Sequence, residues 1–195
     1  MSKSLRVVFM GTPAFAVPGL RSIVESQHEL VGVVTAPDRP AGRGKNLRFS
    51  AVKEAALEYN IPLFQPEKLP SEDTVAQLKA LEADVFVVVA FRMLPKVVWE
   101  LPQLGTFNLH ASLLPQYRGA APIHWSIING EQVSGLTTFL IDAKIDTGAI
   151  LLQKKLDILA SDTVGTLSER MQAQSGELII ATLNGLASGT LKPMP

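Results

Sequence analysis

The 195-residue sequence contains no cysteine. Disulfides, thiolate nucleophiles and zinc or iron–sulfur sites built on cysteine are therefore excluded. The sequence also lacks any apolar stretch approaching the ~18 residues of a membrane span, and the apolar run that follows Ser4 is too short for a signal peptide. We expect a cytoplasmic protein that has no membrane partner.

Net charge is absent too, because 18 Lys and Arg residues balance 18 Asp and Glu residues. This balance argues against a protein whose whole surface binds nucleic acid or a membrane. Residues 38–53 depart from it, since five basic residues against one acidic residue give this segment a net charge of +4. The basic residues are Arg39, Arg43, Lys45, Arg48 and Lys53, and the acidic residue is Asp38.

Several common site motifs are missing. The turn GTPAFAVPG keeps only Gly11 of the GxGxxG pattern that binds dinucleotides. GRGKN lacks the first glycine and the final Ser or Thr of a phosphate-binding loop, and no serine lies on a GxSxG elbow. His28, His110 and His124 have no metal-binding spacing, so we predict no metal, and we expect His28 to be exposed at a helix end.

Apolar runs of strand length alternate with longer segments of helical period, which predicts an α/β fold with a mostly parallel, twisted sheet and helices on both faces. The expected strands are residues 5–10, 30–35, 85–90 and 107–110, with 135–141 and 150–156 as antiparallel or mixed partners. The expected helices are residues 14–26, 51–59, 73–83, 119–129 and 163–186, the last capped by Asp162. The length suggests one domain, residues 1–189, with 190–195 as the start of a linker to a further domain.

Three polar residues lie where strand ends and following loops are expected. Asn108 and His110 alternate on one short strand, so their side chains should point to the same face. Asp146 lies in the loop DAKIDTG, which also contains Asp142. Taken singly, such an Asn, His or Asp is more often a structural hydrogen-bonding or turn residue.

Together, the three side chains suit acyl transfer to an amine without a covalent intermediate. The reaction develops negative charge on a carbonyl oxygen, which the amide N–H of Asn108 can stabilise. The imidazole of His110 can move the amine proton near neutral pH, because histidine titrates at about 6.5. The carboxylate of Asp146 can orient the imidazole or hold a relay water.

The string FNLHASLLPQYRGAAPIHWSIINGE, followed by GLTTFLIDAKIDTGAILLQ, resembles the folate-dependent formyltransferases. The resemblance implies a Rossmann-like formyltransferase fold, the catalytic trio Asn108, His110 and Asp146, and 10-formyltetrahydrofolate as donor. It implies folate contacts at Ser112, Leu113, Leu114, Pro115, Phe91, Met93, Leu94 and Asp142. In the hinge after the central strand, residues 89–94, Arg92 and Met93 stand in place of the glycine-containing aliphatic stretch that is usual in this family.

The strings RVVFMGTPAFAVPGL, TAPDRPAGRGKNL and LLPQYRGAAPI resemble the branch of this family that formylates the methionine carried by initiator tRNA. The resemblance implies initiator methionyl-tRNA as acceptor and contacts from Arg39, Arg43 and Lys45, since basic residues position nucleic acid through phosphates. It also implies a further C-terminal domain outside this chain, and we expect a monomer.

Three alternatives stay open. The same trio would serve formylation of glycinamide ribonucleotide or of an amino sugar nucleotide. A catalytically inactive binding module of the same fold is the third, and loss of a trio residue would mark it. All three trio residues are present.

Overall fold

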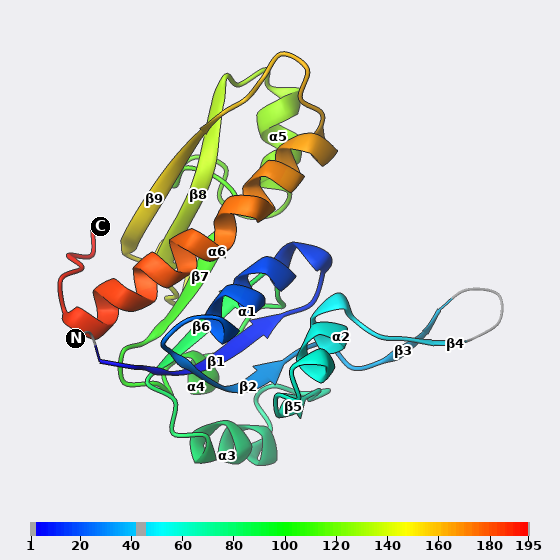
Figure 1. Ribbon diagram of the computed structural model, residues 1–195, viewed down its shortest axis with the longest axis vertical. Helices are drawn as coiled ribbons and strands as arrows, with labels where there is room; N and C mark the ends of the chain where they lie inside the picture. The colour runs from blue at the N-terminus through cyan, green and yellow to red at the C-terminus, as the bar shows by residue number, and fades with distance from the viewer. Residues whose placement is uncertain (1–2, 42–45, 195) are drawn as a thin grey trace.

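A computed structural model describes residues 3–41 and 46–194. Its main sheet has seven strands in the order β5-β2-β1-β6-β7-β8-β9 (Figure 1). The first five strands in that order are parallel, and β8 and β9 complete the sheet as antiparallel partners. In chain order the strands are β1 (Arg6–Gly11), β2 (Glu29–Val34), β5 (Leu63–Phe64), β6 (Val85–Val89), β7 (Thr106–His110), β8 (Val133–Leu140) and β9 (Ile150–Asp157). The predicted fold class is confirmed.

Helices cover both faces of the sheet, because its central strands are apolar on both sides. On β1, Val7 and Phe9 join a buried cluster with helices α1, α2 and α6, whereas Val8 and Met10 join a second cluster with α3 and α4. The helices are α1 (Val17–Val24), α2 (Ala51–Glu58), α3 (Glu72–Ala80), α4 (Lys96–Trp99), α5 (Pro122–Ile128) and α6 (Val164–Ser188). A short 3-10 helix, Ala14–Ala16, precedes α1.

Two short strands that the sequence analysis did not predict form an arm beside the main sheet. Strand β3 (Arg39–Ala41) pairs with β4 (Asn46–Arg48) in antiparallel register, with Arg39 opposite Arg48. The arm projects away from the body of the molecule (Figure 1). Its strands pair with each other and not with the main sheet, so Arg39 and Arg48 lie outside that sheet.

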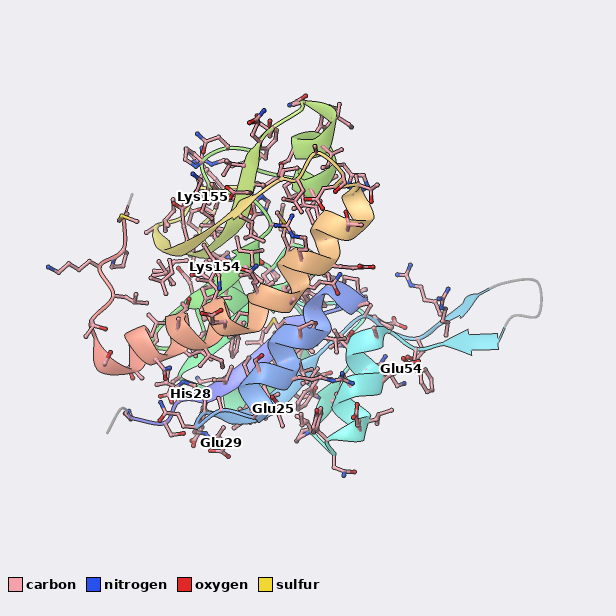
Figure 2. All side chains as sticks on the ribbon, turned by 45° about the horizontal axis from the view of Figure 1, so that its top comes forward. Glu25, His28, Glu29, Glu54, Lys154 and Lys155 are labelled. Carbon is pink, nitrogen blue, oxygen red and sulfur yellow. The ribbon has the colours of Figure 1, made fainter. Side chains whose placement is uncertain are left out.

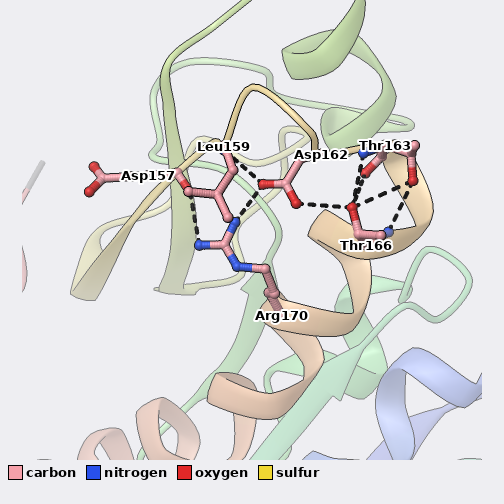
Figure 3. A network of polar contacts seen from close by, with 6 residues as sticks. All are labelled: Asp157, Leu159, Asp162, Thr163, Thr166 and Arg170. Atoms are coloured by element: carbon pink, nitrogen blue, oxygen red, sulfur yellow. Dashed lines mark hydrogen bonds and ion pairs between the residues drawn. The ribbon is translucent and has the colours of Figure 1, made fainter.

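The last helix begins at Val164, and its N-cap lies one residue later than predicted. Thr163, not Asp162, is the N-cap: its side chain accepts from the backbone of Thr166, and the Thr166 side chain accepts from the backbone of Thr163. Asp162 instead accepts the backbone N–H of Leu159 at 2.8 Å and pairs with Arg170, as Figure 3 shows. These contacts lower the pKa of the Asp162 carboxyl, that from Leu159 most strongly.

The predicted helix 119–129 begins only at Pro122. Gly119 and Ala121 have φ of +86° and 55°, and this left-handed backbone is incompatible with an α-helix. The start of the predicted helix is therefore wrong, and residues 117–121 form a loop beside the site described below.

His28 is buried, which corrects the expectation that it is exposed. Its Nδ1 accepts the backbone N–H of Leu5 at 3.2 Å, so its Nε2 carries the hydrogen and donates to Oδ1 of Asn184 at 3.2 Å. Figure 2 shows His28 beside the C-terminal part of α6. Burial lowers the pKa of His28, and the hydrogen bond to Asn184 opposes that effect in part.

Near the C-terminus, Met194 pairs with Ile150 through two backbone hydrogen bonds of 2.7 and 2.8 Å. The segment predicted as a linker therefore contacts the first residue of β9 through Met194. No helix in the described part of the chain is long and apolar enough to cross a membrane.

Candidate active site

A cavity of about 760 Å3 opens at the carboxyl ends of β6 and β7. In parallel α/β sheets this edge is where ligands bind, because the loops that leave the strands converge there. The walls come from the ends of β6, β7 and β8, from the 3-10 helix, and from residues 90–96, 119–124 and 142–146. A cavity of this size accommodates a small organic substrate.

Asn108 and His110 both line this cavity. Their neighbours on β7, Phe107 and Leu109, pack into the cluster on the α6 side, so the two polar side chains share the opposite face as predicted. His110 is 7% exposed and Asn108 is half-buried. Among the described residues, none of the hydrogen bonds engages the Asn108 amide, which leaves this donor available to a ligand.

Asp146 faces His110 from the loop between β8 and β9. Its Oδ2 lies 3.6 Å from Nδ1 of His110, an ion-pair distance that is too long for a direct hydrogen bond. The same Oδ2 accepts the backbone N–H of Gly119 at 2.8 Å. Asp146 has a left-handed φ of 52°, a conformation that aspartate tolerates better than most residues. The structure thus brings the three predicted catalytic side chains to one cavity.

The second ring nitrogen of His110 is fixed by the backbone. Nε2 lies 2.7 Å from the carbonyl oxygen of Tyr117. Because a carbonyl oxygen can only accept, Nε2 carries the hydrogen and donates it. Nδ1 is therefore the nitrogen that can take up or release a proton, and it is the one that faces Asp146.

The cavity lining includes the apolar side chains of Phe91, Met93 and Leu94, and also Asp142. Arg92 also lines the cavity, and its guanidinium donates to the backbone carbonyls of Glu67 and Pro66. Burial, followed by the charge of Arg39, lowers the pKa of Arg92.

Residues 112–115, which the sequence analysis assigned to folate, lie outside the cavity lining. Ser112 is fully buried and donates to the carbonyl of Gln116 at 2.6 Å, and the Leu114 N–H donates to Thr137 Oγ1 at 3.1 Å. The peptide bond between Leu114 and Pro115 is cis. These residues build the turn behind His110, and direct folate contact by them stays a prediction.

The basic segment is only partly described. Arg39 is exposed at the base of the arm, whereas Arg43 and Lys45 lie outside the described residues. Lys53 is not a free cation, because it pairs with Asp38, which also accepts from Gln65 at 2.8 Å. The hydrogen bond from Lys53, with that from Gln65, lowers the pKa of Asp38.

Tyr117 and Gly119 were not predicted as site residues. They act through a backbone carbonyl and a backbone N–H, and such groups leave no signature of residue type in the sequence. The one available signal is the glycine in the string QYRG, which permits the φ of +86° observed at position 119.

The sheet thus holds an amide, an imidazole and a carboxylate around one cavity at its carboxyl edge, a set of groups suited to acyl transfer. The sequence profile described as "Formyl transferase" matches residues 5–183. The chain belongs to the formyl transferase family.

Similar curated proteins include the methionyl-tRNA formyltransferases of Bacteroides thetaiotaomicron and Flavobacterium psychrophilum. The first is 51% identical over 98% of this chain and the second 55% identical over 97%. The chain spans 60% of the length of each of these relatives.

Similar solved structures include a phosphoribosylglycinamide formyltransferase from Bacillus halodurans, with a TM-score of 0.77 and 27% identity over 94% of this chain and 95% of that one. A glycinamide ribonucleotide transformylase from Symbiobacterium toebii has a TM-score of 0.80 and 18% identity, over 98% of this chain and 95% of that one. A sugar 3N-formyl transferase solved with dTDP and 5-N-formyl-THF has a TM-score of 0.71 and 22% identity, over 98% of this chain and 66% of that one. The last two likenesses show the fold alone.

Proposed function

We propose that this chain transfers the formyl group of 10-formyltetrahydrofolate to the amino group of methionine on initiator tRNA. The observation that carries the proposal is the convergence of Asn108, His110 and Asp146 on one cavity. The identity of about 50% with methionyl-tRNA formyltransferases supports the choice of acceptor.

The proposed chemistry is direct acyl transfer through a tetrahedral intermediate. The methionine nitrogen forms a bond to the formyl carbon, and the carbonyl oxygen takes up negative charge. Asn108 donates its amide N–H to that oxygen, and each such donor lowers the barrier by about 3 kcal/mol. The bond from the formyl carbon to the folate nitrogen then breaks, which restores the carbonyl.

The proton of the attacking amine must leave, and the departing nitrogen must gain one. His110 and Asp146 are suited to this exchange, because Nδ1 faces the carboxylate at 3.6 Å and Nε2 is held by Tyr117. Proton transfer by positioned groups of this kind contributes about 10² to 10⁴ in rate.

The donor would occupy the cavity, whose volume of about 760 Å3 lies within the range of small-molecule sites. Phe91, Met93 and Leu94 offer apolar surface to a pterin ring, and Asp142 offers a hydrogen-bond acceptor. The turn of residues 112–115 contributes to the folate site at least by fixing the backbone that follows His110.

The acceptor tRNA would contact the arm formed by β3 and β4. Arg39 is exposed there, and Arg43 and Lys45 are the further proposed phosphate contacts.

The test supplies the purified chain with 10-formyltetrahydrofolate and, in separate reactions, with charged initiator tRNA, glycinamide ribonucleotide or an amino sugar nucleotide. Formylation of the tRNA alone is the expected result. Formylation of glycinamide ribonucleotide alone would favour the second candidate, which the likeness to the Bacillus halodurans enzyme supports. No turnover with any acceptor, together with retained folate binding, would favour an inactive binding module.

A further inference from the structure

The loop of residues 117–119 holds both members of the His110–Asp146 pair through its backbone. The carbonyl of Tyr117 accepts from His110 Nε2 at 2.7 Å, and the N–H of Gly119 donates to Asp146 Oδ2 at 2.8 Å. Backbone groups two residues apart thus set the relative position of an imidazole at the end of β7 and a carboxylate in the loop between β8 and β9.

This loop is built from unfavourable backbone conformations. Tyr117, Gly119 and Ala121 all have positive φ, of 56°, 86° and 55°. Left-handed backbone is disfavoured for tyrosine and alanine, and it persists only where surrounding contacts impose it. Something other than intrinsic preference must therefore hold Tyr117 in place.

The side chain of Tyr117 supplies such a contact. Its hydroxyl donates to Oε1 of Glu131 and accepts from Nδ2 of Asn129 at 3.1 Å. Asn129 is the C-cap of α5, and the N–H of Glu131 donates to the carbonyl of Ser126 at 3.0 Å. The phenol is thus anchored to the end of α5, and the bond to Glu131 raises the pKa of Tyr117.

We propose that Tyr117 is a positioning residue for His110: its phenol, held by Glu131 and Asn129, fixes the carbonyl that sets the tautomer and orientation of the imidazole. The expected change in turnover rests on the proposed function. The expected change in how firmly the His110 imidazole is held does not. Tyr117 does not act on the substrate directly, because its side chain is bonded to α5 and the residue is not among those that line the cavity.

The test compares Tyr117→Phe with Tyr59→Phe, a matched control at the other of the two tyrosines. Tyr117→Phe is expected to lower kcat about tenfold and to change the KM for the folate less than twofold, because only the orientation of a catalytic group is loosened. Tyr59→Phe should leave both constants unchanged. Equal kcat for Tyr117→Phe and the unsubstituted protein would overturn the proposal.

A second pair of variants separates the phenol contact from general packing. Glu131→Gln keeps an oxygen that accepts from the phenol, so it should retain kcat, whereas Glu131→Ala should lower kcat, by no more than Tyr117→Phe does, because the bond from Asn129 remains. The double variant Tyr117→Phe with Glu131→Ala should be no slower than Tyr117→Phe alone, because that substitution already removes the contact with Glu131. Additive losses would contradict the proposed linkage.

A readout on the imidazole itself requires no turnover. NMR of protein with 15N-labelled histidine reports the exchange of the His110 Nε2 hydrogen with water, and His28 serves as the internal reference because its Nε2 hydrogen is bonded to Asn184. Tyr117→Phe should speed exchange at His110 about tenfold and leave His28 unchanged. If exchange at both histidines is unchanged, the positioning role is wrong even in an active enzyme. If exchange at His110 rises in a protein that formylates none of the acceptors, only the proposed function fails.

Discussion

Asp146 and His110 face each other across 3.6 Å, from Oδ2 to Nδ1, and the backbone of one loop holds both, at Nε2 of the imidazole and at the same Oδ2 of the carboxylate. This arrangement fixes a carboxylate beside the only imidazole nitrogen that is not already committed to a backbone carbonyl. The charge of the carboxylate can therefore act on proton transfer at that nitrogen without a large rearrangement of the site.

Replacement of Asp146 by Asn tests the role of this charge. The amide oxygen can still accept the N–H of Gly119, and asparagine tolerates the left-handed φ, so the fold should be kept. We expect the rate of formyl transfer to fall about 100-fold, as for loss of a proton-transfer group, while the melting temperature stays within about 2 °C.

The control for that experiment is Glu25→Gln, which removes a carboxylate charge at the exposed end of α1 (Figure 2). Its rate should equal that of the unsubstituted protein. An Asp146→Asn variant as active as this control would exclude the carboxylate from the chemistry.

Gly148 should be irreplaceable for steric reasons. A Cβ atom at this position would lie 1.6 Å from the backbone oxygen of Leu140, so any side chain would force the loop that carries Asp146 to shift. Gly148→Ala should destabilise the protein by about 1–3 kcal/mol in chemical denaturation and also slow formyl transfer.

Gly165→Ala is the matched control, since the nearest atom to its added Cβ is 3.7 Å away. Alanine at this helical position should leave stability equal or raise it by less than about 1 kcal/mol. Similar losses in the two alanine variants would show that the approach to Leu140 is not the cause.

His28 predicts a dependence of stability on pH. Burial holds the pKa of His28 in the folded protein below the ordinary 6.5 of the unfolded chain. At a pH between these two values the unfolded chain therefore binds more protons than the folded one. The free energy of unfolding should therefore be highest above about pH 6.5 and fall as the pH is lowered below that value. His28→Asn, measured by urea unfolding at pH 7.5 and 5.5, should lose this part of the dependence; an unchanged slope would refute the assignment.

Arg39 and Lys53 should differ in their effects on tRNA binding. Arg39 is exposed, so Arg39→Gln should weaken tRNA binding. The slope of log K against log salt concentration should become shallower by the amount expected for the loss of about one phosphate contact. Lys53 is bound to Asp38, so Lys53→Gln should mainly lower the melting temperature. Equal salt slopes for Arg39→Gln and the unsubstituted protein would remove Arg39 from the tRNA contacts.

The sequence was most informative where periodicity and residue type act together. The apolar run of β6 and the alternation on β7 predicted buried strands and placed Asn108 and His110 on one face. The start of α5 was missed because the left-handed φ of Ala121 has no signature in an alanine, and the burial of His28 was missed because Asn184 is 156 residues away. Contacts made by backbone groups, or by residues distant in sequence, could not be predicted.

The rate of formyl transfer by His110→Ala tests the central claim most directly, measured in a single turnover with saturating 10-formyltetrahydrofolate and charged initiator tRNA. Loss of the imidazole should lower the rate about 100-fold or more, while the Kd of the folate, measured separately, changes little, because the apolar wall of Phe91, Met93 and Leu94 is intact. A rate close to that of the unsubstituted protein would contradict the claim that this imidazole, between Asp146 and Tyr117, carries the chemistry.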